Sequence, residues 1–119
     1  MAVTPGYREY VLEQLGRVTP VTAKSMFGGV GIYAAGRIFG LIDDDVLYFK
    51  VNDVNRPDFE RAGMRPFQPW PGHVMAGYWE LPGEVLEEVD RLRAWMDGAL
   101  AAGTGKAKAK KGSGGKRKG

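Results

Sequence analysis

The feature that most constrains the fold is a series of short apolar runs in the first half of the chain. The connections between these runs are only two or three residues long. Connections this short join antiparallel strands, because a parallel pair of strands needs a long crossover. The sequence therefore predicts an antiparallel meander of four strands, at residues 22–27, 30–34, 37–42 and 46–51.

Two of these connections contain motifs that resemble functional sites. The glycine-rich segment 28–31 resembles a phosphate-binding loop, but such loops open a helix and here a strand follows. We expect these glycines instead to allow a bulge and a close approach of two backbones. The three aspartates at 43–45 suggest a metal site, yet consecutive carboxylates converge poorly on one ion. A solvated hairpin turn is the better interpretation.

Helical periodicity flanks the meander on both sides. The first helix follows Thr4, a suitable N-cap, and has Pro5 at its first position. The second directs Phe59 and Ala62 inward, and the last carries the broadest apolar stripe. The three predicted helices span residues 5–18, 52–63 and 82–101.

Proline and aromatic residues cluster between the last two predicted helices. The prolines predict an irregular loop over residues 64–73, followed by a last strand over residues 73–81. Phe67 and Trp70 lie in this loop. An exposed aromatic side chain there would mark a protein-binding surface, because interfaces are enriched in aromatic residues.

These elements together predict one α+β domain, an antiparallel sheet with helices, over residues 1–102. A chain of 119 residues suits a single domain. Residues 38–42 and 46–49 are apolar at nearly every position, which is typical of central strands that are covered on both faces. We expect helices to cover one face of the sheet and a less complete layer to cover the other.

Positive charge is concentrated at the end of the chain. Seven of the 17 basic residues and none of the 14 acidic ones lie in residues 103–119, so residues 1–102 carry a net charge of −4. The segment 103–119 has no large apolar side chain, and we expect it to be disordered. Its charges would attract DNA or RNA without sequence preference, or else would only keep the chain in solution. The seven residues are Lys106, Lys108, Lys110, Lys111, Lys116, Arg117 and Lys118.

A second group of basic residues lies on the helix predicted over residues 52–63 and at its exit. Three acidic residues are interleaved with three arginines, so we expect mutual neutralisation rather than a basic binding face. The arginines are Arg56, Arg61 and Arg65, and the acids are Asp53, Asp58 and Glu60.

The residues that catalysis and cofactor binding usually require are scarce. The absence of cysteine excludes disulfides and thiolate metal sites, and it favours a reducing, cytoplasmic location. His73 is the only histidine, and a catalytic role would need a nucleophile or an orienting carboxylate beside it. We expect no enzyme activity, cofactor, metal, signal peptide or membrane span.

Five sequence blocks in order resemble the TfoX N-terminal domain family of bacterial competence regulators. The blocks are SMFGGVGIY at 25–33, LYFKV at 47–51, NRPDF at 55–59, GMRPF at 63–67 and YWELP at 78–82. The resemblance covers residues 5–101. It implies a two-layer antiparallel sheet with helices, of outline α-β-β-β-α-β-β-α and similar to type III secretion chaperones, and it implies no catalytic residues. The signature positions, which we expect to be structural, are Met26, Phe27, Gly28, Gly29, Gly31, Tyr33, Lys50, Arg56, Pro57 and Phe59.

Two functions fit these observations. The first is a non-enzymatic regulatory or adaptor protein, linked to transcription or competence, whose domain binds a protein and whose tail binds nucleic acid. The second is a chaperone-like protein-binding module with an incidental solubilising tail. A homodimer fits the second. Neither requires a membrane.

Overall fold

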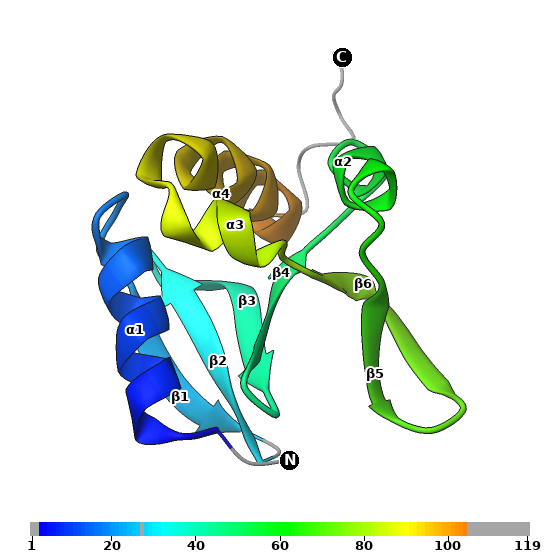
Figure 1. Cartoon of the computed structure of the whole chain (residues 1–119), viewed down its shortest axis with the longest axis horizontal. Helices are drawn as coiled ribbons and strands as arrows, with labels where there is room; N and C mark the ends of the chain where they lie inside the picture. Colours follow the sequence, from blue (N-terminus) through cyan, green and yellow to red (C-terminus); the bar gives the residue numbers. More distant parts are fainter. Residues whose placement is uncertain (1–2, 27, 105–119) are drawn as a thin grey trace.

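An antiparallel sheet of six strands forms the centre of the molecule, in the order β1-β2-β3-β4-β6-β5 (Figure 1). The computed structural model describes residues 3–26 and 28–104. This arrangement confirms the predicted α+β class, and the order of helices and strands follows the predicted outline, with one more strand in the meander and a second helix at the end. The strands are β1 (Thr22–Met26), β2 (Gly29–Ala34), β3 (Arg37–Asp43), β4 (Val46–Lys50), β5 (Pro66–Trp70) and β6 (His73–Glu80).

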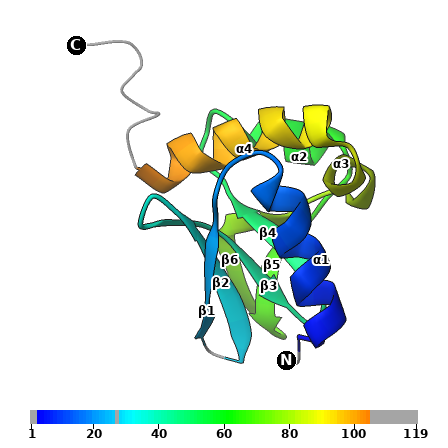
Figure 2. The same cartoon turned by 90° about the vertical axis from the view of Figure 1, so that its left-hand side faces the viewer.

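Helices cover one face of this sheet (Figures 1 and 2). α1 and α4 contribute to the core above β2, β3 and β4, and α3 joins them at the end of β6. α2 lies beyond the end of β4, where Phe59 packs edge-on against Trp95 of α4 with 4.7 Å between ring centres. None of the helices in the described residues is long and apolar enough to cross a membrane. The helices are α1 (Pro5–Gly16), α2 (Arg56–Arg61), α3 (Gly83–Glu87) and α4 (Val89–Thr104).

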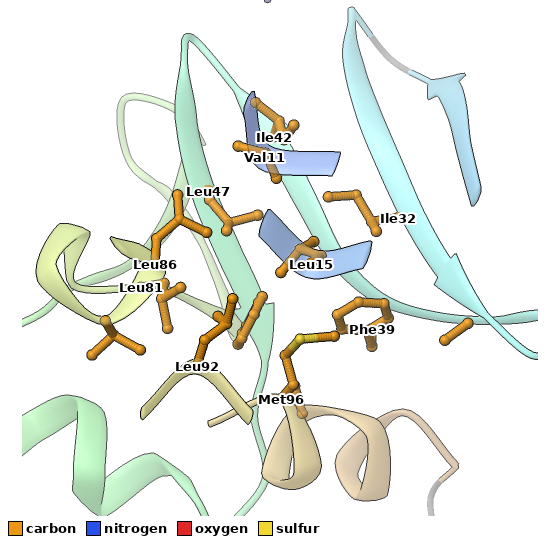
Figure 3. Close-up of a cluster of buried hydrophobic side chains, with 14 of the residues drawn as sticks. Val11, Leu15, Ile32, Phe39, Ile42, Leu47, Leu81, Leu86, Leu92 and Met96 are labelled. Carbon is orange, nitrogen blue, oxygen red and sulfur yellow. The ribbon is translucent and has the colours of Figure 1, made fainter. Parts of the chain in front are cut away.

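The hydrophobic core fills the space between the helices and the sheet (Figure 3). Val11 and Leu15 of α1 and Leu92 and Met96 of α4 are completely buried. Burying each such side chain contributes about 1.5–3 kcal/mol, so this layer accounts for much of the stability. The sheet presents Ile32, Phe39, Ile42, Leu47 and Phe49 to these helices.

Two tight turns set the twist of the meander. The pairs Ala35-Gly36 and Asp44-Asp45 both have positive φ, between 52° and 78°, which is the conformation of type I′ hairpin turns. The predicted turns at these positions are therefore confirmed. Asp45 also fixes the start of α1, because its Oδ1 accepts from the amide of Thr4 at 2.8 Å. Its Oδ2 accepts from the Thr4 hydroxyl at 2.9 Å.

The prediction of an irregular loop over residues 64–73 is wrong. Pro66 to Trp70 form β5, which pairs with β6 at the edge of the sheet. Proline is tolerated in an edge strand because the outward N–H that it lacks would have no partner there. The β5–β6 register shifts at two places, so this hairpin is less regular than the meander.

The single helix predicted over residues 82–101 is also wrong. Glu88 has an extended backbone, with φ −116° and ψ 110°, and it separates α3 from α4. The predicted apolar stripe survives this break, since Val85, Leu86, Leu92 and Met96 are all buried. α4 continues to Thr104, two residues beyond the predicted end of the domain at residue 102.

The second helix is shorter than predicted, because two asparagines hold the preceding turn. The Oδ1 of Asn55 accepts from the amide of Asn52 at 2.8 Å, and its Nδ2 donates to the carbonyl of Lys50. α2 therefore begins at Arg56 rather than at residue 52. Phe59 is buried as predicted, but Ala62 is exposed, since it forms the C-cap of this helix.

Candidate protein-binding groove

The face of the sheet opposite the helices carries a second set of apolar side chains. Tyr48 of β4 lies opposite Leu41 of β3 and opposite Glu80 of β6. Because residues directly opposite one another on antiparallel strands share a face, these three side chains point to the same face of the sheet. Leu41 and Tyr48 are half-buried, which matches the expectation of a face with only partial cover.

A groove of about 490 Å³ lies on this face. Its lining includes Met26 of β1 together with Phe67 and Trp70 of β5, although β1 and β5 are the two outer strands of the sheet. In a flat sheet with strands roughly 4.8 Å apart, six strands would hold these edges roughly 24 Å apart. The sheet is therefore strongly curved, and the β5–β6 hairpin forms one wall of the groove.

The opposite wall of the groove depends on Gly31 having no side chain. A Cβ atom at this position would lie 2.5 Å from the sulfur of Met26 and 3.3 Å from the Cδ1 of Ile38. The space above Gly31 is thus taken by Met26, which lies across β2 toward β3. Met26 and Ile38 both line the groove.

At the other signature glycines, the absence of a side chain allows a close approach of a neighbouring strand or a positive φ. A Cβ atom at Gly29 would lie 2.4 Å from the carbonyl oxygen of Ile42 in the neighbouring strand. Gly28 has a φ of 80° and lies in the turn between β1 and β2. The bulge that we expected here lies elsewhere, where the β2–β3 register shifts between Ile32 and Tyr33.

Aromatic side chains of the β5–β6 hairpin line the groove at different depths. Phe67 is buried and packs against Tyr48 with 4.6 Å between ring centres. Trp70 is 60% exposed and stacks on His73 at 4.5 Å, with the two rings nearly parallel. Met75 also lines the groove and is 38% exposed. The hairpin thus presents a large apolar surface to the solvent.

Three carboxylates lie near Tyr48, whose ring packs against Phe67 of the groove. Burial raises the pKa of Tyr48 above its usual value of 10.0, and the carboxylates of Glu80, Asp43 and Asp44 raise this pKa further. Burial also raises the pKa of Tyr78, and Tyr33 adds to that increase. Both phenols are therefore neutral at physiological pH.

The lysines of this face lie over other tyrosine rings. The Nζ of Lys50 is 4.9 Å from the ring centre of Tyr78, and the Nζ of Lys24 is 5.5 Å from that of Tyr33. These distances are within the range of cation–π attraction. The carboxylates and the lysines of this face therefore have different neighbours.

The residues singled out from the sequence fall into three groups. Phe67 and Trp70 come together at the groove, where five signature residues lie on the strands around it and Gly28 lies in the β1–β2 turn. The five are Met26, Gly29, Gly31, Tyr33 and Lys50. Arg56, Pro57 and Phe59 belong to α2 instead. Phe27 and the seven basic tail residues, Lys106 to Lys118, lie outside the described residues.

The arginines of α2 have the acidic partners that the sequence predicts. Arg56 contacts Asp53 at 2.8 Å and Glu60 at 3.8 Å. Arg61 forms an ion pair with Asp58. The expectation of mutual neutralisation is confirmed for these two arginines, and α2 offers no concentrated positive charge from them.

Among the groove-lining residues that the sequence reasoning did not single out are Ile38, Leu41 and Met75. The signal for the first two was present, since their strand is apolar at nearly every position and so has a second apolar face. Met75 had no such signal, because its position in the groove depends on the curvature of the β5–β6 hairpin.

Comparison with known protein families identifies the family of this chain. The family model described as the TfoX N-terminal domain matches residues 13–103. The chain belongs to the TfoX N-terminal domain family. All six strands of this TfoX N-terminal domain lie within the matched residues, so the groove is formed by the part of the chain that defines the family. No curated protein matches the sequence.

Proposed function

We propose that this TfoX N-terminal domain is a non-enzymatic regulatory or adaptor protein that binds another protein through the groove. The observation that carries the proposal is the exposure of Trp70 beside an apolar groove of about 490 Å³. A buried tryptophan removes up to about 250 Å² from water. Because Trp70 is 60% exposed, a partner could cover about 150 Å² of it, which at about 25 cal/mol/Å² is worth up to about 4 kcal/mol and makes Trp70 a candidate for an interface hot spot.

The side chains around Trp70 suit a protein partner. Met26 and Met75 border the groove, and methionine adapts its shape to different partners because it is unbranched and polarisable. Phe67 gives the groove a firm base, since it is buried against Tyr48. A fixed aromatic base with adaptable rims is typical of surfaces that bind a segment of another protein.

The chemistry of the groove supports a binding role rather than catalysis. Tyr48 and Tyr78 are neutral phenols at physiological pH because their pKa values are raised, which makes them poor bases and poor nucleophiles. His73 is the only histidine of the chain, and its ring is stacked on the exposed Trp70. We therefore assign no reaction to this surface.

The basic tail would add a second activity. Seven positive charges at residues 106–118 would attract nucleic acid, whereas residues 1–102 carry a net charge of −4 and would be repelled by it. A protein that holds a partner in the groove and contacts DNA through its tail suits a role in transcription or competence regulation.

The role of the tail is tested with the full chain and a variant that ends at Thr104. We expect the full chain to retard duplex DNA in a gel at low salt, with an affinity that falls steeply as salt rises. The truncated variant should not retard the DNA. Equal retardation by both proteins would contradict the proposal.

The role of the groove is tested by crosslinking in cells. A photo-crosslinking amino acid replaces Trp70 in one variant and Ala94 of α4, which is exposed on the helical side, in a control. We expect a discrete protein adduct from position 70 alone. The same adducts from both positions would argue against the groove. A groove partner found for a chain that binds no DNA would favour the chaperone-like alternative.

A further inference from the structure

The charges beside the groove indicate which kind of protein segment it binds. We infer that the partner segment carries a bulky apolar side chain with a lysine or arginine close to it. This inference rests on the proposed function, because it concerns the same groove. The apolar side chain would pack against Trp70, and the cation would lie near Glu80 and Asp44.

The position of Glu80 follows from the register of the sheet. Glu80 lies directly opposite Tyr48, and side chains opposite one another on antiparallel strands are about 4.5–5.5 Å apart at their Cβ atoms. Tyr48 in turn contacts Phe67, the buried aromatic of the groove. The carboxylate of Glu80 is therefore one side chain away from the apolar lining.

Asp44 adds a second negative charge at the same end. It lies in the turn between β3 and β4, where it is exposed. The increase in the Tyr48 pKa provides independent support, since Glu80 and Asp44 both contribute to it. No ion pair joins Glu80 or Asp44 to a basic side chain within residues 3–26 and 28–104.

The basic residues of this face leave these carboxylates available. Lys50 lies over the ring of Tyr78, in the row of side chains beyond Tyr48. Lys24 lies over the ring of Tyr33, and its strand β1 is four strands away from β6, which carries Glu80. A cation from a partner would therefore meet two acidic groups whose charge these lysines do not cancel by direct contact. Charge complementarity of this kind selects among partners more strongly than it adds affinity.

The same charges argue against the other occupants of the groove. A second copy of the chain, docked by the same surface with its two-fold axis close to these carboxylates, would bring its own Glu80 and Asp44 toward the first pair, and like charges across an interface are unfavourable. Nucleic acid would be repelled for the same reason. The tail of the chain is basic, but residues 103–119 contain no apolar side chain larger than alanine to fill the groove.

The experiment is a selection of random peptides displayed on phage against the full-length chain. Selected peptides are then synthesised, and their affinities are measured by fluorescence polarisation. We expect an aromatic or aliphatic side chain beside lysine or arginine to recur among them. Trp70→Ala should weaken these peptides by more than about tenfold, because hot-spot residues have effects of this size.

Charge variants test the assignment of the cation. Glu80→Gln and Asp44→Asn should each weaken binding about two- to fivefold, which is the range for partly exposed ion pairs. Glu84→Gln on α3 is the matched control, since Glu84 is an exposed carboxylate on the helical side, and it should leave the affinity unchanged. Circular dichroism confirms that each variant is folded.

Each result bears on a different claim. Apolar peptides that depend on Trp70 but show no preference for basic residues would overturn this inference and leave the proposed function intact. Peptides that bind wild type and Trp70→Ala equally, or the absence of any selected peptide, would overturn both. A selection that yields only acidic peptides bound by the basic tail would also overturn both, because Trp70→Ala would not affect the binding of such peptides.

Discussion

Replacing Gly29 by alanine tests the role of the glycine-rich turn. A Cβ atom here would lie 2.4 Å from the carbonyl oxygen of Ile42, whereas carbon and oxygen atoms normally stay about 3.3 Å apart. The neighbouring strand must therefore shift by about 1 Å, and the obstructing atom belongs to its backbone. Overpacking of this kind costs about 3 kcal/mol.

Part of this cost is offset by the unfolded state. Alanine loses less backbone freedom on folding than glycine, which returns about 0.5–1 kcal/mol. We therefore expect Gly29→Ala to lower the free energy of unfolding by about 2 kcal/mol. For a domain of this size, the midpoint of thermal unfolding should fall by about 8–16 °C.

Gly31→Ala is the matched control, because it lies two residues away in the same strand and gains the same methyl group. Its nearest obstruction is the sulfur of Met26 at 2.5 Å, near the end of a side chain that can rotate away. We expect Gly31→Ala to cost less than about 1 kcal/mol. Thermal and urea unfolding, followed by circular dichroism, measure both variants. Equal destabilisation by the two, or a Gly29→Ala variant as stable as wild type, would refute the reasoning.

Three further predictions concern the helices and the tyrosines. Asp45→Ala removes both hydrogen bonds to Thr4 and should lower the unfolding free energy by about 1–2 kcal/mol in urea titrations; an unchanged midpoint would contradict this. Phe59→Ala should cost about 3–5 kcal/mol, because this fully buried ring joins α2 to α4; a loss below about 1 kcal/mol would show that α2 is not part of the core. Tyr48 and Tyr78 have raised pKa values, so the folded state holds their protons more tightly than the unfolded state. The contribution of these two tyrosines to the free energy of unfolding should be fully present below about pH 10 and should be lost as the pH rises past it. Urea midpoints at about pH 9 and about pH 11 would measure this loss, and Tyr48→Phe should reduce it.

Much of the fold follows from local signals in the sequence. The meander was predictable because its turns contain residues that tolerate positive φ, such as Gly36, Asp44 and Asp45. α1 was predictable from Thr4, whose hydroxyl accepts from the amide of Tyr7 at 3.4 Å. In each of these places the chain conformation is decided by residues close together in the sequence.

The errors arose where distant contacts decide the structure. β5 was predicted as a loop because its prolines indicate a break, and only its place at the sheet edge makes them acceptable. The interruption at Glu88 left no signal, because α3 and α4 both bury the residues that a continuous helix would bury.

The groove was predictable only in part. The sequence identified Trp70 and Phe67 as candidates, and it indicated that the sheet has a second apolar face. It did not indicate that the β5–β6 hairpin brings these residues across the sheet toward Met26, since that depends on curvature and on the space above Gly31. Tertiary packing therefore assembles the groove from individually ordinary residues.

The central claim is that the groove is the binding site. The affinity of a groove ligand for two variants of the β5–β6 hairpin tests this claim most directly. Trp70→Ala and Val74→Ala both remove an exposed apolar side chain from the same hairpin, but only Trp70 lines the groove. With the protein crosslinked from position 70, or with a selected peptide, titration should show a loss of more than about tenfold for Trp70→Ala and an unchanged affinity for Val74→Ala. Equal affinities for the two variants would contradict the assignment of the groove as the binding site.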